Sequence, residues 1–235
     1  MDIERARFNM VEQQIRTWDV LDQEILDLLF ILKRENFVPP AYRSMAFTDM
    51  EIPLNIGATP TGEFMFSPKM EARLAQELAL KRHETVLEVG AGSGYMAALL
   101  AHRAKQVLTL EILPQLAQFA RENLDRAGMT NARVEQADAT LIGSPGKVAG
   151  DFTQRDAWDA ILLSGSVPFV PENILARLRP GGRLIAIVGD QPIMTARLFT
   201  RLDRGGAAPK FESIDLFETV VRPLVHFPQH EAFRF

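Results

Sequence analysis

A glycine turn between a buried strand and a helix constrains this chain more than any other feature of its sequence. Residues 85–89, Thr-Val-Leu-Glu-Val, form an apolar, partly β-branched run that is typical of a strand covered on both faces. Residues 90–94, Gly-Ala-Gly-Ser-Gly, follow it, and the run at 96–101 is strongly helix-forming. Glycines let the backbone turn tightly and approach a ligand, whose negative end can bind the free N–H groups at the helix start. The stretch therefore predicts a nucleotide-type binding site.

The spacing of the glycines and of three acidic residues indicates which nucleotide is bound. A dinucleotide fingerprint needs a glycine at its sixth position, where this chain has Tyr95. Glu88 lies just before the first glycine, and Glu111 ends the next predicted strand about twenty residues further on, where a carboxylate can accept the two ribose hydroxyls. Asp138 follows a third short strand at 132–136. This acid-x-Gly-x-Gly-x-Gly pattern resembles the S-adenosylmethionine-dependent methyltransferases with a Rossmann-like fold.

Composition argues against several other classes of protein. The chain has 235 residues, of which 47% are hydrophobic and 24% charged, and this fits one globular α/β domain. The net charge of −4 gives no electrostatic reason to expect a nucleic-acid partner. There is no cysteine, and the four histidines form no helical pair at ligand spacing, so we expect no metal. The first residues do not resemble a signal peptide and no run is long enough for a transmembrane helix, so we expect a cytoplasmic protein without a membrane partner.

A helical segment is predicted at the amino terminus. The apolar periodicity of residues 3–16 and 23–32 indicates two amphipathic helices, and Asp22 is the expected N-cap of the second. A short helix is expected from about Tyr42 to Phe47. We call residues 1–50 the helical cap and expect it to pack against the sheet.

A long loop separates the helical cap from the predicted sheet. Residues 51–68 contain several prolines, and loops of this length in a compact domain are often functional or mobile, so a lid is one interpretation. The side chains of residues 64–66, Phe-Met-Phe, either fill the core or line the site. Residues 69–235 are expected to form the α/β core that binds the cofactor, and the three segments together a single domain.

Further motifs narrow the resemblance to one family. The chain resembles the protein-L-isoaspartate O-methyltransferase family, in order and spacing, from about residue 8 to 225. This resemblance implies a seven-stranded Rossmann-like sheet with helices on both faces, S-adenosyl-L-methionine as cofactor, and methyl ester formation on isoaspartyl residues in protein repair. The segments that carry the resemblance, besides the glycine turn, are Met-Val-Glu-Gln-Gln-Ile-Arg (10–16), Val-Leu-Asp (20–22), Arg-Glu-Asn-Phe-Val-Pro (34–39), the helix at 112–124 and the predicted strands at 158–163 and 178–189.

The resemblance implies a role for each residue of the cofactor site. Glu88 would lie near the methionine amino group, and Glu111 would bind the ribose hydroxyls. Asp138 would accept a hydrogen bond from the adenine amino group, with Ile112 and Ala139 against the ring. The residues that would back the methionine and ribose portions are Gly90, Ala91, Gly92, Ser93 and Gly94.

The chain departs from the family in the loop that faces the methyl acceptor. The family's loop reads Gly-x-x-x-Thr-Ile-Ser-x-Pro, with the serine hydroxyl near the reacting methyl group and the substrate carboxylate. When Pro68 is aligned on the family's proline, Phe64, Met65 and Phe66 replace Thr, Ile and Ser. Ser67 is one position away, and it is the candidate catalytic residue only if the backbone shifts. An apolar loop would favour an apolar or aromatic acceptor, because a buried carboxylate would lack a donor.

Four functions are therefore open from the sequence. The first is isoaspartyl repair, with a peptide or protein as substrate. The second is methyl transfer to a different, small and apolar molecule. The third is S-adenosylmethionine binding without catalysis, and the fourth is an unrelated Rossmann nucleotide-binding protein, which the glycine spacing disfavours.

Overall fold

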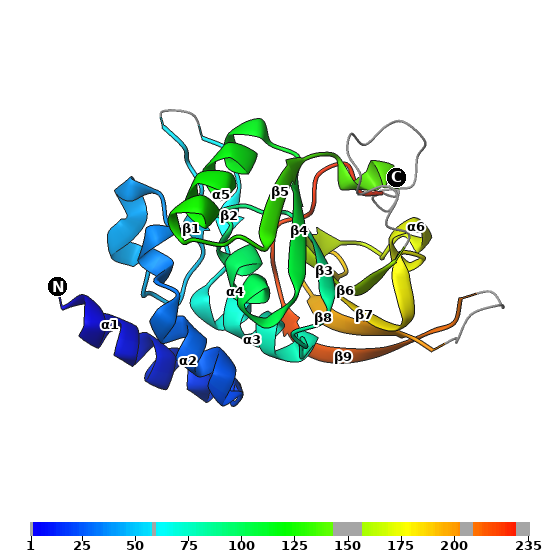
Figure 1. Cartoon of the computed structure of the whole chain (residues 1–235), viewed down its shortest axis with the longest axis horizontal. Helices are drawn as coiled ribbons and strands as arrows, with labels where there is room; N and C mark the ends of the chain where they lie inside the picture. The colour runs from blue at the N-terminus through cyan, green and yellow to red at the C-terminus, as the bar shows by residue number, and fades with distance from the viewer. Residues whose placement is uncertain (1, 58–59, 143–156, 203–208, 229–235) are drawn as a thin grey trace.

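The strands of the core form one seven-stranded sheet. A computed structural model describes residues 2–57, 60–142, 157–202 and 209–228. Within these residues the strand order is β5-β4-β3-β6-β7-β8-β9 (Figure 1), which confirms the expected α/β sheet. The strands are β3 (Thr85–Val89), β4 (Gln106–Glu111), β5 (Ala132–Gln136), β6 (Trp158–Val167), β7 (Leu178–Val188), β8 (Met194–Arg201) and β9 (Phe211–Thr219).

The order of the strands reverses beside β3. This strand pairs in parallel with β4 on one side and with β6 on the other. β5 continues the sheet beyond β4, and β7 continues it beyond β6, both in parallel. In open α/β sheets ligands bind outside the carboxyl ends of the strands at such a reversal. The topology therefore places the site at the ends of β3, β4 and β6.

The last two strands extend the sheet in antiparallel fashion. The sequence of residues 194–202 is compatible with either a helix or a strand. In the structure Ala196 pairs with Ile187 of β7, and Leu198 pairs with Ile214 of β9. Because these residues pair with a strand on each side, the segment is a strand.

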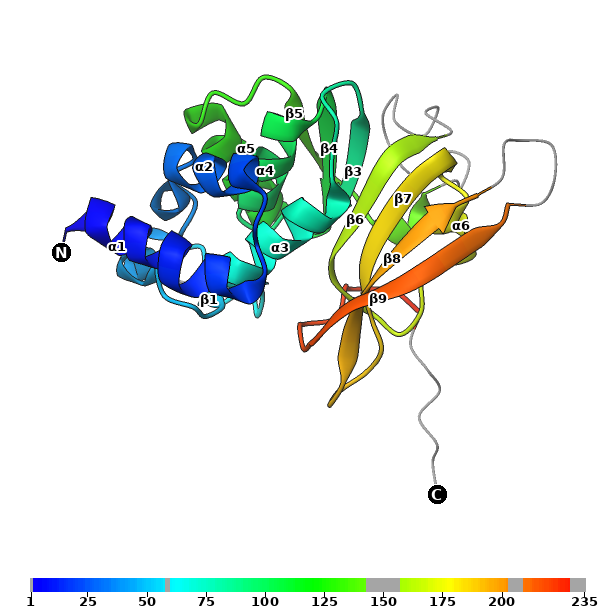
Figure 2. The same ribbon diagram turned by 90° about the horizontal axis from the view of Figure 1, so that it is seen from below.

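Helices cover the sheet on both faces. Figure 2 shows α3, α4 and α5 on one face and the short α6 on the other, and they belong to two separate hydrophobic clusters. Their bounds are α3 (Pro68–Leu78), α4 (Tyr95–Arg103), α5 (Pro114–Arg126) and α6 (Glu172–Leu175). No helix among the described residues is long and apolar enough to cross a membrane.

Successive strand residues enter two different hydrophobic clusters. Val86 of β3 packs in the cluster that contains α3, α4 and α5, whereas Leu87 packs in the cluster that contains residues of α6. β6 repeats this alternation with Ala160 and Ile161. Because both faces are covered, the central strands β3, β4 and β6 are buried at almost every position.

The helical cap packs mainly on helices, and it also contacts the sheet, where the Trp18 ring meets that of Phe217 in β9 edge-on at 5.0 Å. Asp22 caps its second helix as predicted, and its carboxylate accepts the Glu24 N–H at 2.8 Å. The cap contacts α3, and the Phe37 ring meets that of Tyr95 in α4 edge-on at 5.2 Å. The single helix expected at 3–16 is divided, and the short helix expected near residue 42 is a 3-10 helix. The cap contains α1 (Ile3–Asn9), a π-helical segment (Met10–Ile15), α2 (Gln23–Ile31) and 3-10 turns at Arg16–Trp18, Arg34–Asn36 and Pro40–Met45.

A buried arginine ties the cap to the loop at residues 51–68 and to α3. Arg34 and Glu71 form an ion pair at 2.9 Å, with side chains only 1% and 3% exposed. The same guanidinium donates to the carbonyls of Ala46 and Phe66. Burial raises the pKa of Glu71 to about 7, although Arg34 opposes the shift. The pair therefore fixes the backbone of the loop at Phe66.

We predict that Arg34→Ala lowers the free energy of unfolding by about 3–5 kcal/mol, because the carboxyl of Glu71 then stays buried without its partner. Arg16→Ala is the control, since Arg16 pairs with Glu12 at side-chain exposures of 37% and 31%, and it should change stability far less. Urea unfolding measures both variants. Equal losses would contradict a special role for the buried pair.

Candidate functional site

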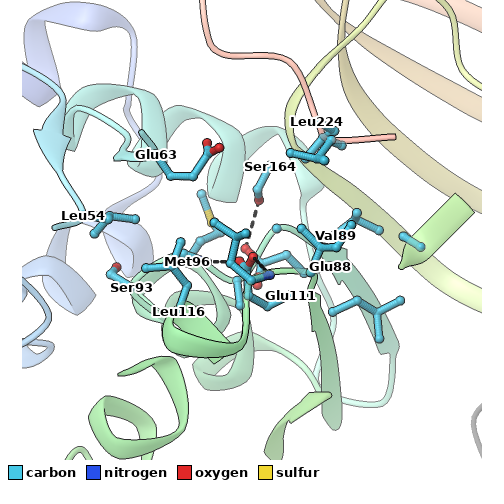
Figure 3. Close-up of a pocket in the computed structure, with 18 of the residues that line it drawn as sticks. Leu54, Glu63, Glu88, Val89, Ser93, Met96, Glu111, Leu116, Ser164 and Leu224 are labelled. Atoms are coloured by element: carbon cyan, nitrogen blue, oxygen red, sulfur yellow. Dashed lines mark hydrogen bonds between the residues drawn. The ribbon is translucent and has the colours of Figure 1, made fainter. Parts of the chain in front are cut away.

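A cleft opens at the carboxyl ends of β3, β4 and β6, where the topology predicts it. The free space in it, which is continuous with the solvent, amounts to about 810 Å³. Figure 3 shows its lining between Leu54 and Glu63 on one side and Leu224 on the other. Every residue predicted from the sequence to bind the cofactor lines it except Gly94. Those lining residues are Glu88, Gly90, Ala91, Gly92, Ser93, Glu111, Ile112, Asp138 and Ala139.

The glycine turn adopts a backbone that other residues rarely take. Gly90, Gly92 and Gly94 have φ angles of +96°, +51° and +81°. A Cβ atom at Gly90 would lie 3.2 Å from the carbonyl oxygen of Ser164 in β6. A Cβ atom at Gly94 would lie 3.1 Å from the carbonyl oxygen of Ala120 in α5. Gly94 therefore serves the packing of α4 on α5, which explains why it does not line the cleft.

Glu111 holds the turn against the end of β4. Its Oε2 accepts the Gly92 N–H at 2.9 Å, and its Oε1 accepts the Leu113 N–H at 3.0 Å. The residue is 6% exposed, and burial raises the pKa of its carboxyl above the usual range while the backbone N–H groups oppose the shift. These bonds aim the carboxylate at the cleft and leave lone pairs for a ligand.

Glu88 presents an unpaired oxygen to the cleft. The residue is fully buried in the centre of the sheet, and its Oε1 accepts the Ser164 hydroxyl at 2.9 Å (Figure 3). Oε2 is buried and accepts no hydrogen bond of good geometry among the described residues, although the Thr109 hydroxyl on the neighbouring strand is close enough to lower the pKa of Glu88. Burial raises the pKa of Glu88 to about 8. An unpaired buried carboxyl oxygen is costly, and a ligand with a cationic donor would satisfy it.

Asp138 is shared between its own turn and the carboxyl-terminal segment. Its Oδ1 accepts the N–H and hydroxyl of Thr140 at 2.9 and 2.6 Å. Its Oδ2 lies 2.7 Å from Nδ1 of His226. The segment around His226 adds Leu224 and Phe227 to the cleft lining. Sequence reasoning missed these residues and Ser164, because only the tertiary structure brings them beside β3.

The loop at residues 51–68 forms one wall of the cleft. It contains a small antiparallel pair, β1 (Ile52–Pro53) with β2 (Phe64–Met65). Phe64, Met65 and Phe66 all line the cleft, and Met65 is also buried to 3% exposure, so this segment both fills core and lines the site.

Ser67 is not brought into the cleft. It is the N-cap residue of α3 and is absent from the cleft lining, which ends at Phe66 on this side of the loop. The catalytic role of Ser67 stays a prediction, and the geometry gives it no support. Within the described ranges no group of His, Asp and Glu side chains is arranged to hold a metal ion.

Known proteins share both the sequence and this fold. A profile of the family described as "Protein-L-isoaspartate(D-aspartate) O-methyltransferase (PCMT)" matches residues 5–217. The chain belongs to this family. Like its members, it is an S-adenosylmethionine-dependent methyltransferase.

Relatives and a solved structure extend this result. The protein-L-isoaspartate O-methyltransferase of Methanoculleus marisnigri is 37% identical over 185 residues, covering 79% of this chain and 78% of the relative. That of Syntrophotalea carbinolica is 35% identical over 225 residues, covering 96% and 95%. A structure from Plasmodium falciparum in complex with S-adenosyl-L-homocysteine has a TM-score of 0.71 at 18% identity, covering 95% of this chain and 98% of that one. The structural likeness shows that the fold is shared.

We predict that Gly94→Ala lowers the free energy of unfolding by about 1–3 kcal/mol more than Gly128→Ala does, because only the first substitution forces a methyl group against another backbone. Gly128 is a matched control, since it has a φ angle of +70° but nothing within 4 Å of the added Cβ atom. Thermal or urea unfolding compares the two variants. Equal losses would show that α5 does not constrain the turn.

Proposed function

We propose that this methyltransferase transfers the methyl group of S-adenosylmethionine to the free carboxylate of isoaspartyl residues in peptides and proteins. The observation that supports this most is the cleft itself: the glycine turn, Glu111 and the unpaired Glu88 oxygen meet at the sheet's reversal point in a chain of this family. The relatives named above carry the same enzyme name. A small apolar acceptor or non-catalytic binding is not favoured by these likenesses.

The residues of the cleft fit the cofactor. Glu111 is oriented by two backbone N–H groups, so it can accept the ribose hydroxyls. Glu88 Oε2 lies unpaired where an ammonium group would satisfy it. Asp138 is the acceptor assigned to the adenine amino group, with Ile112 and Ala139 as apolar neighbours in the lining. These assignments are proposals.

The reaction requires no proton transfer by the protein. S-adenosylmethionine, when bound, supplies a methyl group that its sulfonium already activates. A carboxylate acceptor is ionised at neutral pH, so it needs no general base. The described lining accordingly contains no histidine or lysine. The chain's contribution is to hold both reactants close and aligned and to exclude water with Phe64, Met65 and Phe66.

Glu88 should make cofactor binding depend on pH. Because its pKa is raised to about 8, the carboxyl is protonated at neutral pH before binding. An ammonium group favours the ionised form, so binding releases a proton, and affinity for S-adenosylhomocysteine should rise between about pH 6 and 7.5, by up to about tenfold per unit. Calorimetry in buffers of different ionisation enthalpy measures the released proton.

Glu88→Gln should bind more weakly and lose this pH dependence, because its side chain cannot ionise. Glu122→Gln, on the exposed side of α5, should keep both the affinity and the proton release. A Glu88→Gln variant with the affinity and pH profile of the wild type would disprove the assignment.

The proposed activity is tested by transfer of labelled methyl groups from S-adenosylmethionine to an isoaspartyl peptide, with the matching aspartyl peptide as control. We expect a base-labile ester on the isoaspartyl form alone. Protein that binds the cofactor yet leaves this peptide unmethylated would refute the proposal.

A further inference from the structure

The described lining of the cleft offers an anionic acceptor no positive charge. Its described lining contains carboxyl groups and no arginine or lysine. The opposite wall, Phe64 to Phe66, is apolar and donates no side-chain hydrogen bond, and Ser67 lies outside the lining. A carboxylate placed there without a donor would be repelled and poorly solvated. An acceptor carboxylate therefore needs a cation at the rim. The lining carboxyls are Glu63, Glu71, Glu88, Glu111 and Asp138.

Arg222 is positioned at that rim by its backbone. The chain leaves β9 at Thr219 and then pairs with the end of β6 through Ser166. The Ser166 N–H donates to the Arg222 carbonyl at 2.8 Å, and the Leu224 N–H donates to the Ser166 carbonyl at 2.9 Å. The next two residues, Pro223 and Leu224, line the cleft. The backbone of Arg222 is therefore fixed directly beside the cleft, and its side chain extends from there.

The guanidinium of Arg222 stacks on the cleft wall and stays available. Its Cζ atom lies 4.4 Å from the centroid of the Phe64 ring, whose residue lines the cleft. Among the described residues no side chain forms a hydrogen bond or ion pair with this guanidinium, and the residue is exposed. Burial raises the pKa values of Glu51 and Glu63, and the charge of Arg222 opposes both shifts without pairing to either carboxyl. A stacked guanidinium keeps its N–H edge free for a carboxylate.

We propose that Arg222, stacked on Phe64, forms the subsite that binds the carboxylate of the methyl acceptor. This inference rests on the proposed function, and it identifies the cationic group that would bind the acceptor's carboxylate. One carboxylate oxygen pairs with the guanidinium, which can bind a carboxylate through two N–H groups. The other oxygen attacks the methyl carbon, the carbon–sulfur bond breaks, and its electron pair goes to sulfur. No proton moves.

The same subsite separates substrate from product. The acceptor enters as an anion and leaves as a neutral methyl ester, so it loses its ion pair with Arg222 when the reaction is complete. A guanidinium at this position therefore favours binding of the unmethylated form. It also provides a hydrogen-bond donor for a carboxylate beside a wall that is otherwise apolar.

Arg222→Gln tests the subsite, because it keeps a long polar side chain and removes the charge. We expect the KM for an isoaspartyl peptide to rise about three- to tenfold, because a charge-assisted pair at a solvent-exposed position is lost. kcat should change less, and the Kd for S-adenosylhomocysteine should stay within about twofold, since the cofactor residues are untouched. Arg222→Lys should recover part of the loss, and Phe64→Leu should raise KM by a smaller factor.

Arg82→Gln is the matched control. Arg82 is also an exposed arginine, but it lies before β3, at the end of the strand opposite the cleft. Its KM and Kd values should equal those of the wild type. Thermal unfolding of the Arg222 and Arg82 variants should coincide with that of the wild type, which separates a binding role from a structural one.

Peptide binding to the complex with S-adenosylhomocysteine separates this inference from the proposed function. If the wild type methylates the peptide and Arg222→Gln has the same KM and peptide Kd, the subsite is refuted and the function stands. If the wild type binds the peptide through Arg222 but does not methylate it, the subsite stands and the function fails. If the wild type does not bind the peptide, both are refuted.

Discussion

The turn after β3 is held by three elements, and the rest of the site depends on it. Gly90 lies against the carbonyl of Ser164 in β6, and Gly94 lies against Ala120 in α5. Glu111 reaches from β4 and accepts the Gly92 N–H. A side chain at either glycine would push the turn away from the element it contacts. The cleft therefore lies where it does because β3 is placed between β4 and β6 in the sheet.

Charge explains how one cleft can accept two unlike reactants. The carboxyls of its lining suit a donor that carries an ammonium and a sulfonium group. They oppose an anionic acceptor. The positive charge of Arg222, whose guanidinium stacks on Phe64 at the edge of the cleft, offsets this repulsion. Methyl transfer removes the positive charge of the sulfonium and the negative charge of the acceptor together. Both products consequently carry fewer charges for these groups to bind than the reactants do.

Much of the fold and of the cofactor site could be predicted from the sequence. The strand at 85–89 and the acids Glu88 and Glu111 are local features, because strand periodicity and turn chemistry involve neighbouring residues. Asp22 was predicted as an N-cap on the same grounds, and it caps α2. The sequence of residues 194–202 fits both a strand and a helix, and only the pairing with β7 distinguishes them.

The sequence by itself determined the α/β class and the family and predicted where the cofactor binds, because these follow from short local motifs along the chain. Only the tertiary structure decided what surrounds the acceptor. It placed Phe66 rather than Ser67 in the wall, with Arg34 holding the Phe66 carbonyl. It also brought Ser164 to Glu88 and Arg222 to Phe64. These contacts join residues far apart in sequence, and their geometry depends on how strands, loop and carboxyl-terminal segment pack, which no local pattern encodes.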